Sequence, residues 1–271
     1  MKHKCLAILV VGAFAVLYGP SIAMAQLSSF GVLGGSVVTN TGATAISGNL
    51  GVSPGSAVTG FPPGVVTGGS IHAADAAAAQ AQSDLTVLYN QLAGSSCNTN
   101  LTGQDLGGLT LTPGVYCFAA SAQLTGTLTL DAQGNPNATF VFQIGSTLTT
   151  ASGSSVLLIN GASTCGVAWQ VGSSATLGTG TTFAGTIVAL TSITLNTSSS
   201  VTGRTLARNG AVTLDTNQVT FCSGGAGLPG LPPPPQNVSS VPAMSPPALA
   251  GLALLLAGLG WLQTRKAQAH G

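Results

Sequence analysis

The chain is organised around a short alternation of polar and apolar residues that recurs toward its C-terminal half. Three segments carry Thr-Leu-x-Thr after a small or apolar residue, at positions 175–179, 193–197 and 212–216. Their leucines, Leu177, Leu195 and Leu214, lie 18 and 19 residues apart. A fixed period of about 20 residues is typical of a solenoid, in which each repeat forms one coil stacked on the last.

The same Thr-Leu pair recurs upstream, and its leucines are again spaced by 18 and 19 residues: Leu111, Leu130 and Leu148. The step from Leu148 to Leu177 is longer, at 29 residues, and is expected to hold an extra loop. Alternation with period two predicts strands whose leucines point inward and whose threonines point outward. About 18 residues per coil suits three short sides. Successive coils would hold equivalent threonines roughly 4.7–4.9 Å apart.

One helix is expected, over residues 70–93. Ser70 is expected to cap its start, and Gly94 to end it in a left-handed conformation. Apolar residues at spacings of three and four predict one buried stripe: Ile71, Ala74, Ala78, Ala81, Leu85, Leu88 and Leu92. Asp84 avoids this stripe and is expected to face water, and His72 lies beside it as an ordinary histidine, not a ligand. The partner for the stripe would be one side of the solenoid.

Charge is scarce throughout the chain. Charged residues are 4% of the 271, whereas soluble domains average about 25%. Between residues 26 and 223 there are five aspartates, two arginines and no lysine or glutamate, giving a net charge of −3. Nucleic-acid binding is therefore not expected, because it depends on clustered Lys and Arg.

Both ends of the chain read as targeting segments around a single domain, residues 26–223. Residues 1–25 have the basic start, apolar stretch and small-residue cleavage site of a signal peptide, with a short transmembrane anchor as the alternative. Residues 224–240 form a Gly- and Pro-rich linker. Residues 241–271 follow, with an apolar run over 246–262, the lower limit for a transmembrane helix, and then Arg265-Lys266.

This tail resembles the C-terminal sorting signals of the PEP-CTERM and IPTL-CTERM type found in Gram-negative bacteria. The resemblance implies an exosortase-like protease as a partner and a membrane anchor that is cut. The protein is then expected to be secreted or held in the cell envelope.

Four cysteines remain after the signal peptide, and an even count in a secreted chain suggests disulfides. Three pairings are possible, and we favour Cys97–Cys117 and Cys165–Cys222. The first pair is close in sequence, and the second follows by elimination. Zinc is the alternative, but no Cys-x-x-Cys spacing supports it.

Catalytic and cofactor motifs are missing. The domain holds one histidine, His72, and no Gly-x-Ser-x-Gly motif. Asp131 and Asp215 follow equivalent Thr-Leu pairs, but the coils between them make a catalytic carboxylate pair doubtful. We expect no enzyme activity, no metal and no cofactor.

The candidate functional surface is the threonine grid. An uncharged, regular face suits an ordered solid such as frozen water, because hydroxyls can hold waters while methyls shape the gaps between them. The candidate face comprises the threonines of the Thr-Leu-x-Thr side: Thr147, Thr150, Thr176, Thr179, Thr194, Thr197, Thr213 and Thr216.

Several segments between residues 27 and 222 have distinctive local sequences: Phe30-Gly-Val-Leu-Gly-Gly, Gly48-Asn-Leu-Gly-Val-Ser-Pro54, the alanine-rich helix with Asp84-Leu-Thr-Val-Leu-Tyr89, Leu109-Thr-Leu-Thr-Pro-Gly-Val-Tyr116, Phe140-Val-Phe-Gln-Ile144 and the run from Thr202 to Asp215. Together these segments resemble the DUF3494 ice-binding protein family. The resemblance implies a mainly β fold: a right-handed, discontinuous, three-sided β-solenoid with one long helix alongside. It also implies an ice surface as partner, bound through one flat face; we expect a monomer.

Ice faces in this family often carry Thr-(Ala/Gly)-x-(Thr/Asn). Three segments match, at Thr41–Thr44, Thr179–Thr182 and Thr202–Thr205, but they fall at different points of the repeat, and Arg204 would be an odd choice for such a face. Two sides therefore stay open, and we favour the Thr-Leu-x-Thr side. The competing functions are a structural or adhesive matrix protein without ice affinity and, more weakly, a polysaccharide lyase or hydrolase.

Overall fold

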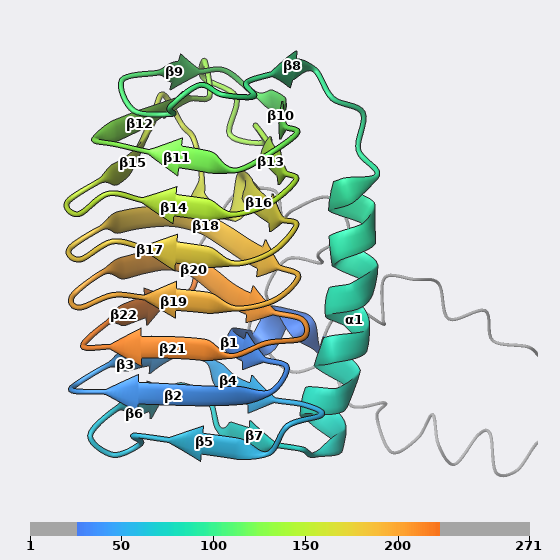
Figure 1. Ribbon diagram of the computed structural model, residues 1–271, viewed down its shortest axis with the longest axis vertical. Helices are drawn as coiled ribbons and strands as arrows, with labels where there is room; N and C mark the ends of the chain where they lie inside the picture. Colours follow the sequence, from blue (N-terminus) through green and yellow to red (C-terminus); the bar gives the residue numbers. More distant parts are fainter. Residues whose placement is uncertain (1–25, 223–271) are drawn as a thin grey trace, which may run out of the picture. The chain divides into compact units, whose positions relative to one another are not determined.

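The computed structural model describes residues 26–222, and the predicted signal peptide, linker (224–240) and C-terminal tail (241–271) lie outside these described residues. Within them the chain forms a 15-stranded sheet and a seven-stranded sheet (Figure 1). Every ladder between strands is parallel. The predicted mainly β solenoid is confirmed. In the described part of the chain, no helix is both long and apolar enough to cross a bilayer.

The coils have three sides. The seven-stranded side contains β11 (Ala122–Leu124), β14 (Leu148–Thr150), β17 (Ala175–Leu177), β19 (Ile193–Leu195), β21 (Val212–Asp215), β2 (Val37–Thr41) and β5 (Ala57–Thr59). The helix-covered side contains β8 (Thr99–Asn100), β10 (Gly114–Phe118), β13 (Phe140–Ile144), β16 (Val167–Val171), β1 (Phe30–Gly34), β4 (Asn49–Val52) and β7 (Ile71–Ala73). The third side contains β9 (Thr110–Leu111), β12 (Thr127–Asp131), β15 (Ser155–Ile159), β22 (Gln218–Thr220), β3 (Ala45–Ser47) and β6 (Val65–Thr67). Short 3-10 turns, η2 (Leu27–Ser29) and η3 (Thr164–Gly166), complete the fold.

Two long strands, β18 (Thr182–Ala189) and β20 (Ser200–Ala207), continue from the third side onto the helix-covered side. Paired glycines mark the corner, Gly185 with φ +108° and Gly203 with φ +152°. A Cβ at Gly203 would lie 2.0 Å from the carbonyl oxygen of Gly185. Only glycine therefore allows the coils to stack at this bend.

The stack is discontinuous in sequence. Strand β2 pairs with β21 on one side and with β5 on the other, so the first coils of the chain extend the stack beyond the last ones. Thr39 lies opposite Thr213, although 174 residues separate them. The helix α1 (Ala76–Ala93) runs back along the stack from this end toward β8 (Figure 1).

The interior is a column of apolar side chains with an aromatic stack at its centre. Rings of Tyr116, Phe142 and Trp169 come from successive coils, with centroids 5.5 and 3.8 Å apart. Phe183 follows at 4.9 Å from Trp169. Trp169 Nε1 donates to the carbonyl oxygen of Ala184 at 3.0 Å, which pairs the one polar atom of that ring.

Asn217 ties adjacent coils together at a corner. Its Nδ2 donates to the carbonyl oxygens of Asn196 at 2.9 Å and Ser199 at 3.1 Å, and its Oδ1 accepts from the Asp215 amide at 2.6 Å. The side chain is buried. The side chain thus pairs the Asp215 amide and gives a further donor to two carbonyl oxygens that also accept from backbone amides.

The helix begins six residues later than predicted. Asp75 is the N-cap, and its side chain accepts from the amide of Ala78 at 2.8 Å. Residues Ile71–Ala73 instead form β7, which pairs with β4, so His72 lies on a strand. The prediction of Ser70 as cap was wrong because the strand pairing wins over helix periodicity. Gly94 ends the helix as predicted, but with φ −85°, not in a left-handed conformation.

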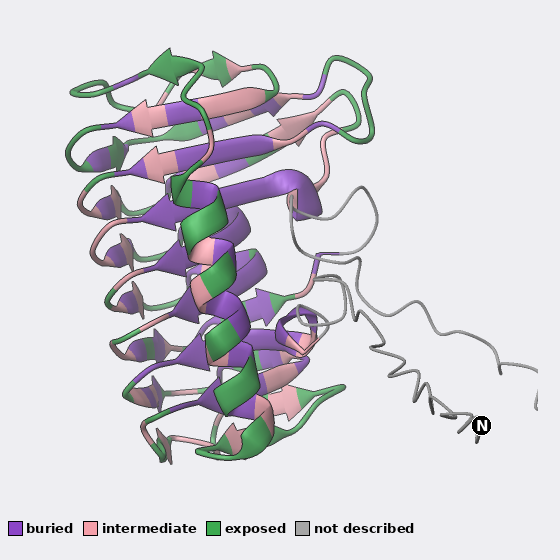
Figure 2. Cartoon of the chain, turned by 90° about the vertical axis from the view of Figure 1, so that its right-hand side faces the viewer, coloured by how far each residue is buried: buried purple, intermediate pink, exposed green. Residues whose placement is uncertain are grey.

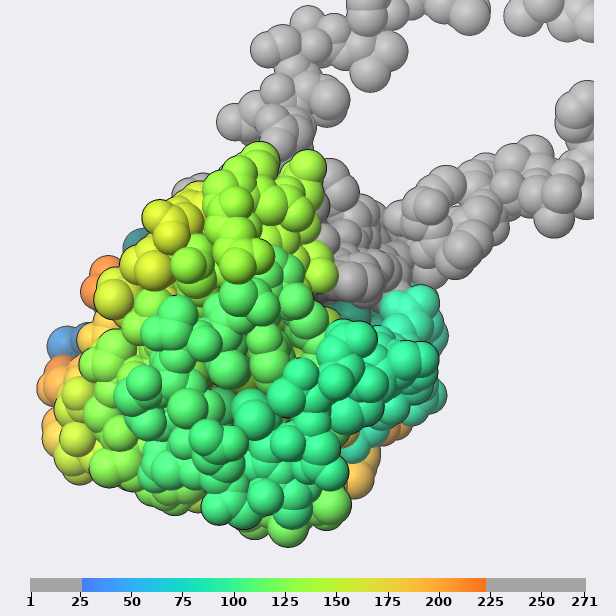
Figure 3. All heavy atoms as spheres, turned by 90° about the horizontal axis from the view of Figure 1, so that it is seen from above, coloured from blue at the N-terminus to red at the C-terminus, as the bar shows by residue number. Residues whose placement is uncertain are grey.

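The helix buries one face on the helix-covered side (Figure 2). Ala81, Leu85, Leu88 and Leu92 pack against strand residues such as Val188. Figure 3 shows the helix standing beside the coils when they are viewed along the stack.

Asp84 is also buried, at 3% exposed, so the prediction that it faces water was wrong. Gln80 Nε2 donates to its Oδ1 at 2.8 Å. Desolvation raises the pKa of the Asp84 carboxyl despite this bond.

The four cysteines form the two disulfides favoured from the sequence. Cys97 is bonded to Cys117, and Cys165 to Cys222. The second bond joins η3 to the end of the described chain, across 57 residues.

Candidate binding face

The outward surface of the seven-stranded side carries one continuous row of threonines. Register pairs Thr149 with Thr176, Thr176 with Thr194, Thr194 with Thr213, Thr213 with Thr39 and Thr39 with Thr59. We call these six residues the threonine ladder. Gln123 of β11 continues the row at one end, opposite Thr149.

The ladder has an unbroken register from strand to strand. Its five steps span about 24 Å at the usual spacing of parallel strands. Alternate residues on the same strands, such as Ile193, Leu195 and Val212, are buried in the core, which fixes which face each threonine takes. No bulge interrupts the pairings of this sheet.

Small side chains flank the ladder. On the side where each strand begins, Ser174, Ser192 and Ala211 lie in successive coils, as their carbonyl oxygens accept from the first strand amides. β-Branched threonines have few rotamers, so the methyl and hydroxyl positions of the ladder are largely preset.

Most ladder hydroxyls are available to solvent. Within residues 26–222, the side chains of Thr149, Thr176, Thr194 and Thr59 have no protein hydrogen-bond partner. Thr39 Oγ1 donates to Thr213 Oγ1 over a long 3.4 Å. The face therefore presents hydroxyls that water can bond.

The predicted face is split by the structure. Thr176, Thr194 and Thr213 are ladder residues. Thr147 lies just before β14, two residues from the ladder residue Thr149, and its Oγ1 donates to Ser121 Oγ at 2.8 Å. Thr150 is 3% exposed and points inward, where its hydroxyl lies 2.8 Å from Thr181 Oγ1.

Thr150 is therefore not part of the exposed face, contrary to our expectation. The reason is a change of register: Leu148 pairs with Ala175, not with Leu177. The Thr-Leu pair is thus offset by two residues from that of the next coil, so that Thr149, not Thr147, aligns with Thr176, and Thr150 takes an inward position.

Thr179, Thr197 and Thr216 lie beyond the strand ends, in the corner toward the third side. All three are exposed. Thr197 Oγ1 donates to Asp215 Oδ2 at 2.5 Å, and Thr216 Oγ1 to Asp215 Oδ1 at 3.1 Å. Threonines at the corner therefore hold the Asp215 carboxylate beside the face, and a second carboxylate, that of exposed Asp105, lies beyond Gln123 at the end of the row.

Three ladder residues escaped the sequence prediction, Thr39, Thr59 and Thr149. In the segments Val37-Val-Thr39 and Ala57-Val-Thr59 an inward valine precedes the threonine, and the residue after the threonine is Asn40 or Gly60, not leucine. A search for alternation around threonine, without requiring leucine, would have found them.

The third side is the other exposed face. It holds the upstream Thr-Leu pairs, with Thr110 opposite Thr129, so these pairs belong to a different side from the later ones. Its surface is less even, since Leu157 is 51% and Val65 55% exposed.

The three Thr-Gly-x-Thr segments do not lie on one face. Thr41 and Thr179 are exposed beside the seven-stranded side, whereas Thr182 and Thr202 are exposed on the third side and Thr44 is buried. Arg204 is buried too, and burial lowers its pKa to about 10. Arg204 therefore projects from neither exposed face of the solenoid.

No group of three or more metal-ligating side chains occurs within residues 26–222. Together, the fold and the face define a parallel β-solenoid with a side helix and a flat, threonine-bearing sheet.

A family model described as Ice-binding-like matches residues 32–220, so the chain belongs to that family. It is 63% identical over 194 residues to an ice-binding protein of Nostoc sp. (strain HG1), covering 71% of each chain.

Solved structures agree. A crystal structure of an ice binding protein from an Antarctic biological consortium has TM-score 0.72 and 48% identity, and the match covers 74% of this chain and 90% of that one. An ice-binding protein from Antarctomyces psychrotrophicus has TM-score 0.71 and 39% identity, with 74% and 98% covered. The family resemblance and the solenoid expected from the sequence are both confirmed.

Proposed function

We propose that this protein binds ice through the threonine ladder and so inhibits ice growth and recrystallisation. The observation that carries the proposal is the register itself: six threonines from six coils face solvent in one row. Membership of the ice-binding-like family supports the ligand, and the ladder supports the face.

The ladder suits a solid ligand for two physical reasons. Each threonine offers a hydroxyl to a bound water and a methyl to the space between waters, and burying a methyl-sized group is worth about 0.8 kcal/mol. The threonine side chains have few rotamers and are held by the sheet, so adsorption to ice costs little side-chain conformational entropy. A solid also needs flatness, and the even seven-stranded side meets this need better than the third side.

Binding to ice separates this function from that of a structural matrix protein. The purified protein should partition into slowly growing ice and stop recrystallisation of fine-grained ice, whereas a matrix protein on the same fold would stay in the liquid. Partition equal to that of an inert protein such as serum albumin would overturn the proposal.

We further propose that the protein is exported, acts without catalysis and works as a monomer. Two disulfides support export, because they persist in oxidising compartments. Cleavage of the C-terminal tail by an exosortase-like protease, in a Gram-negative envelope, is the accompanying proposal. Mass spectrometry of the protein from cells and medium tests it, since a cut tail shortens the secreted form.

A further inference from the structure

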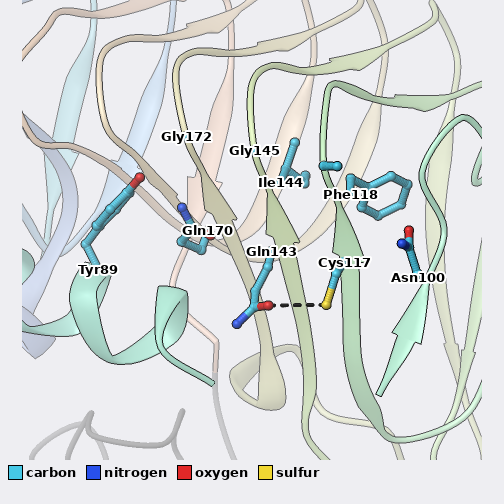
Figure 4. Close-up of a pocket in the computed structure, with 10 residues that line it drawn as sticks. Tyr89, Asn100, Cys117, Phe118, Gln143, Ile144, Gly145, Gln170 and Gly172 are labelled. Atoms are coloured by element: carbon cyan, nitrogen blue, oxygen red, sulfur yellow. Dashed lines mark hydrogen bonds between the residues drawn. The ribbon is translucent and has the colours of Figure 1, made fainter. Parts of the chain in front are cut away.

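A hollow of about 430 Å³ lies on the helix-covered side, where the C-terminal end of α1 no longer covers the strands (Figure 4). Tyr89 of α1 faces it from one edge, and Gln170, Gln143 and Asn100 follow across β16, β13 and β8. The hollow and the threonine ladder lie on different sides of the solenoid, because the ladder is on the seven-stranded side.

The hollow arises from the sequence of each strand. Four side chains at equivalent outward positions of neighbouring strands change from apolar to polar along the stack. Under the helix they are Val188 and Leu206, and beyond it they are Gln143 and Gln170. The floor beside these glutamines is formed by Gly145 and Gly172, whose added Cβ atoms would lie within 2.6 Å of backbone oxygens of the neighbouring coil. Close stacking of coils therefore keeps this part of the surface recessed.

Gln170 is the observation that points to a ligand. The residue is only 6% exposed, its amide has no protein hydrogen-bond partner within residues 26–222, and the amide atoms remain open to solvent in the hollow. An amide in this state offers two donors and one acceptor oxygen into the hollow. Water can pair these groups in the free protein, and a ligand that reproduces the hydrogen bonds can replace that water.

The neighbouring groups add to this set. Gln143 Nε2 is already used, donating to the carbonyl oxygens of Leu92 and Ser95 at 2.7 Å each. Its Oε1 lies 3.2 Å from Cys117 Sγ, a disulfide sulfur that has no proton to donate, so this oxygen remains an acceptor. Tyr89 supplies an aromatic ring, backed by the Arg208 guanidinium at 4.8 Å.

The chemistry of the lining selects the ligand class. No charged side chain lines the hollow, which disfavours phosphates, carboxylates and amines. Amides that both donate and accept match hydroxyl groups, and an aromatic ring matches an apolar ligand face. A volume of about 430 Å³ falls in the range of small-ligand sites. We infer that this hollow binds a neutral sugar residue, as found at the end or side of a polysaccharide chain.

The test is a titration of the ¹⁵N-labelled protein with glucose, galactose, mannose and N-acetylglucosamine at millimolar concentrations. At least one sugar should shift the Gln170 side-chain amide signals in a saturable manner. Gln170→Leu keeps the size of the side chain and removes the amide, and it should weaken that binding by about tenfold or more. The matched control is Gln218→Leu, an exposed glutamine on the third side, which should bind as the unaltered protein does.

Tyr89→Leu provides a second variant, with the same expected loss, should Gln170→Leu fold poorly. Sugars that leave the Gln170 signals unchanged, or equal binding by Gln170→Leu, would overturn the inference. So would saturable shifts produced by a synthetic peptide of residues 223–240 and not by sugars, because they would make the hollow a peptide site. Ice-binding activity is independent of every one of these outcomes.

Discussion

Replacing Thr194 by tyrosine tests the ladder at its centre. Thr194 lies between Thr176 and Thr213, one strand spacing, about 4.8 Å, from each. With covalent bonds of about 1.5 Å, a tyrosine reaches roughly 4 Å farther from the backbone than a threonine. A flat crystal resting on this ring is lifted from the neighbouring side chains.

The size of the effect follows from the range of contact forces. A gap of only about 0.5–1 Å forfeits a quarter to a half of a van der Waals contact, so a gap of several ångströms removes the contacts entirely. The five other ladder methyls would each lose about 0.8 kcal/mol. The total of about 4 kcal/mol corresponds to roughly a thousandfold loss of adsorption strength.

The assay is recrystallisation inhibition over a dilution series, with thermal unfolding measured beside it. The control is Thr202→Tyr, the same exchange at an exposed threonine of the third side. Both changes lie at the surface and should alter unfolding by no more than about 0.5 kcal/mol. Full activity of Thr194→Tyr together with inactivity of Thr202→Tyr would refute our assignment and move the face to the third side.

Three further changes probe the scaffold. Asn217→Ala leaves the Asp215 amide without its partner and removes the donor contacts of the buried Asn217 amide, and should lower the free energy of unfolding by about 1–3 kcal/mol in denaturant titration; an unchanged free energy of unfolding would contradict the corner role. Cys165→Ser opens a link that spans 57 residues, and should cost about 3–4 kcal/mol by the same measurement, while an unchanged midpoint would show that the bond does not restrain the chain. Burial raises the folded-state pKa of Asp84, so its contribution to stability is present below the ordinary aspartate pKa and is lost as pH rises through the folded-state value. Relative to Asp84→Asn, the protein should therefore lose stability between acidic and neutral pH; a constant difference would show that Asp84 does not titrate abnormally.

The sequence predicted most of the architecture because leucine and threonine alternate wherever a strand has one buried face and one solvent-exposed face. Leu177, Leu195 and Leu214 are buried equivalents, as their spacing implied. The period alone could not tell the sides apart. Thr110 and Thr129 repeat the same local pattern on the third side, since alternation reports burial and not the side on which a strand lies.

Two misses have local causes. The coil that contains Thr150 is offset by two residues from the next coil, and the repeated Thr-Leu pair alone does not reveal this offset. Ile71–Ala73 fits a helical stripe and a short strand equally well, and pairing with β4 decides between them. The hollow at Gln170 has no signal along the chain, because Tyr89 and Gln170 meet only through the placement of α1.

The junction between β21 and β2 has a consequence for biogenesis. Thr213 and Thr39 become neighbours only after the chain has been synthesised through β21, so the opening coils pair with each other first and leave one edge, that of β2, open until then. Folding from one end to the other, as in uninterrupted solenoids, is therefore barred, and non-local assembly of this kind is slow. A chain that ended before residue 212 would lack Thr213, which lies between Thr194 and Thr39. Its threonine ladder would then be divided into two separate parts and not simply shortened at one end.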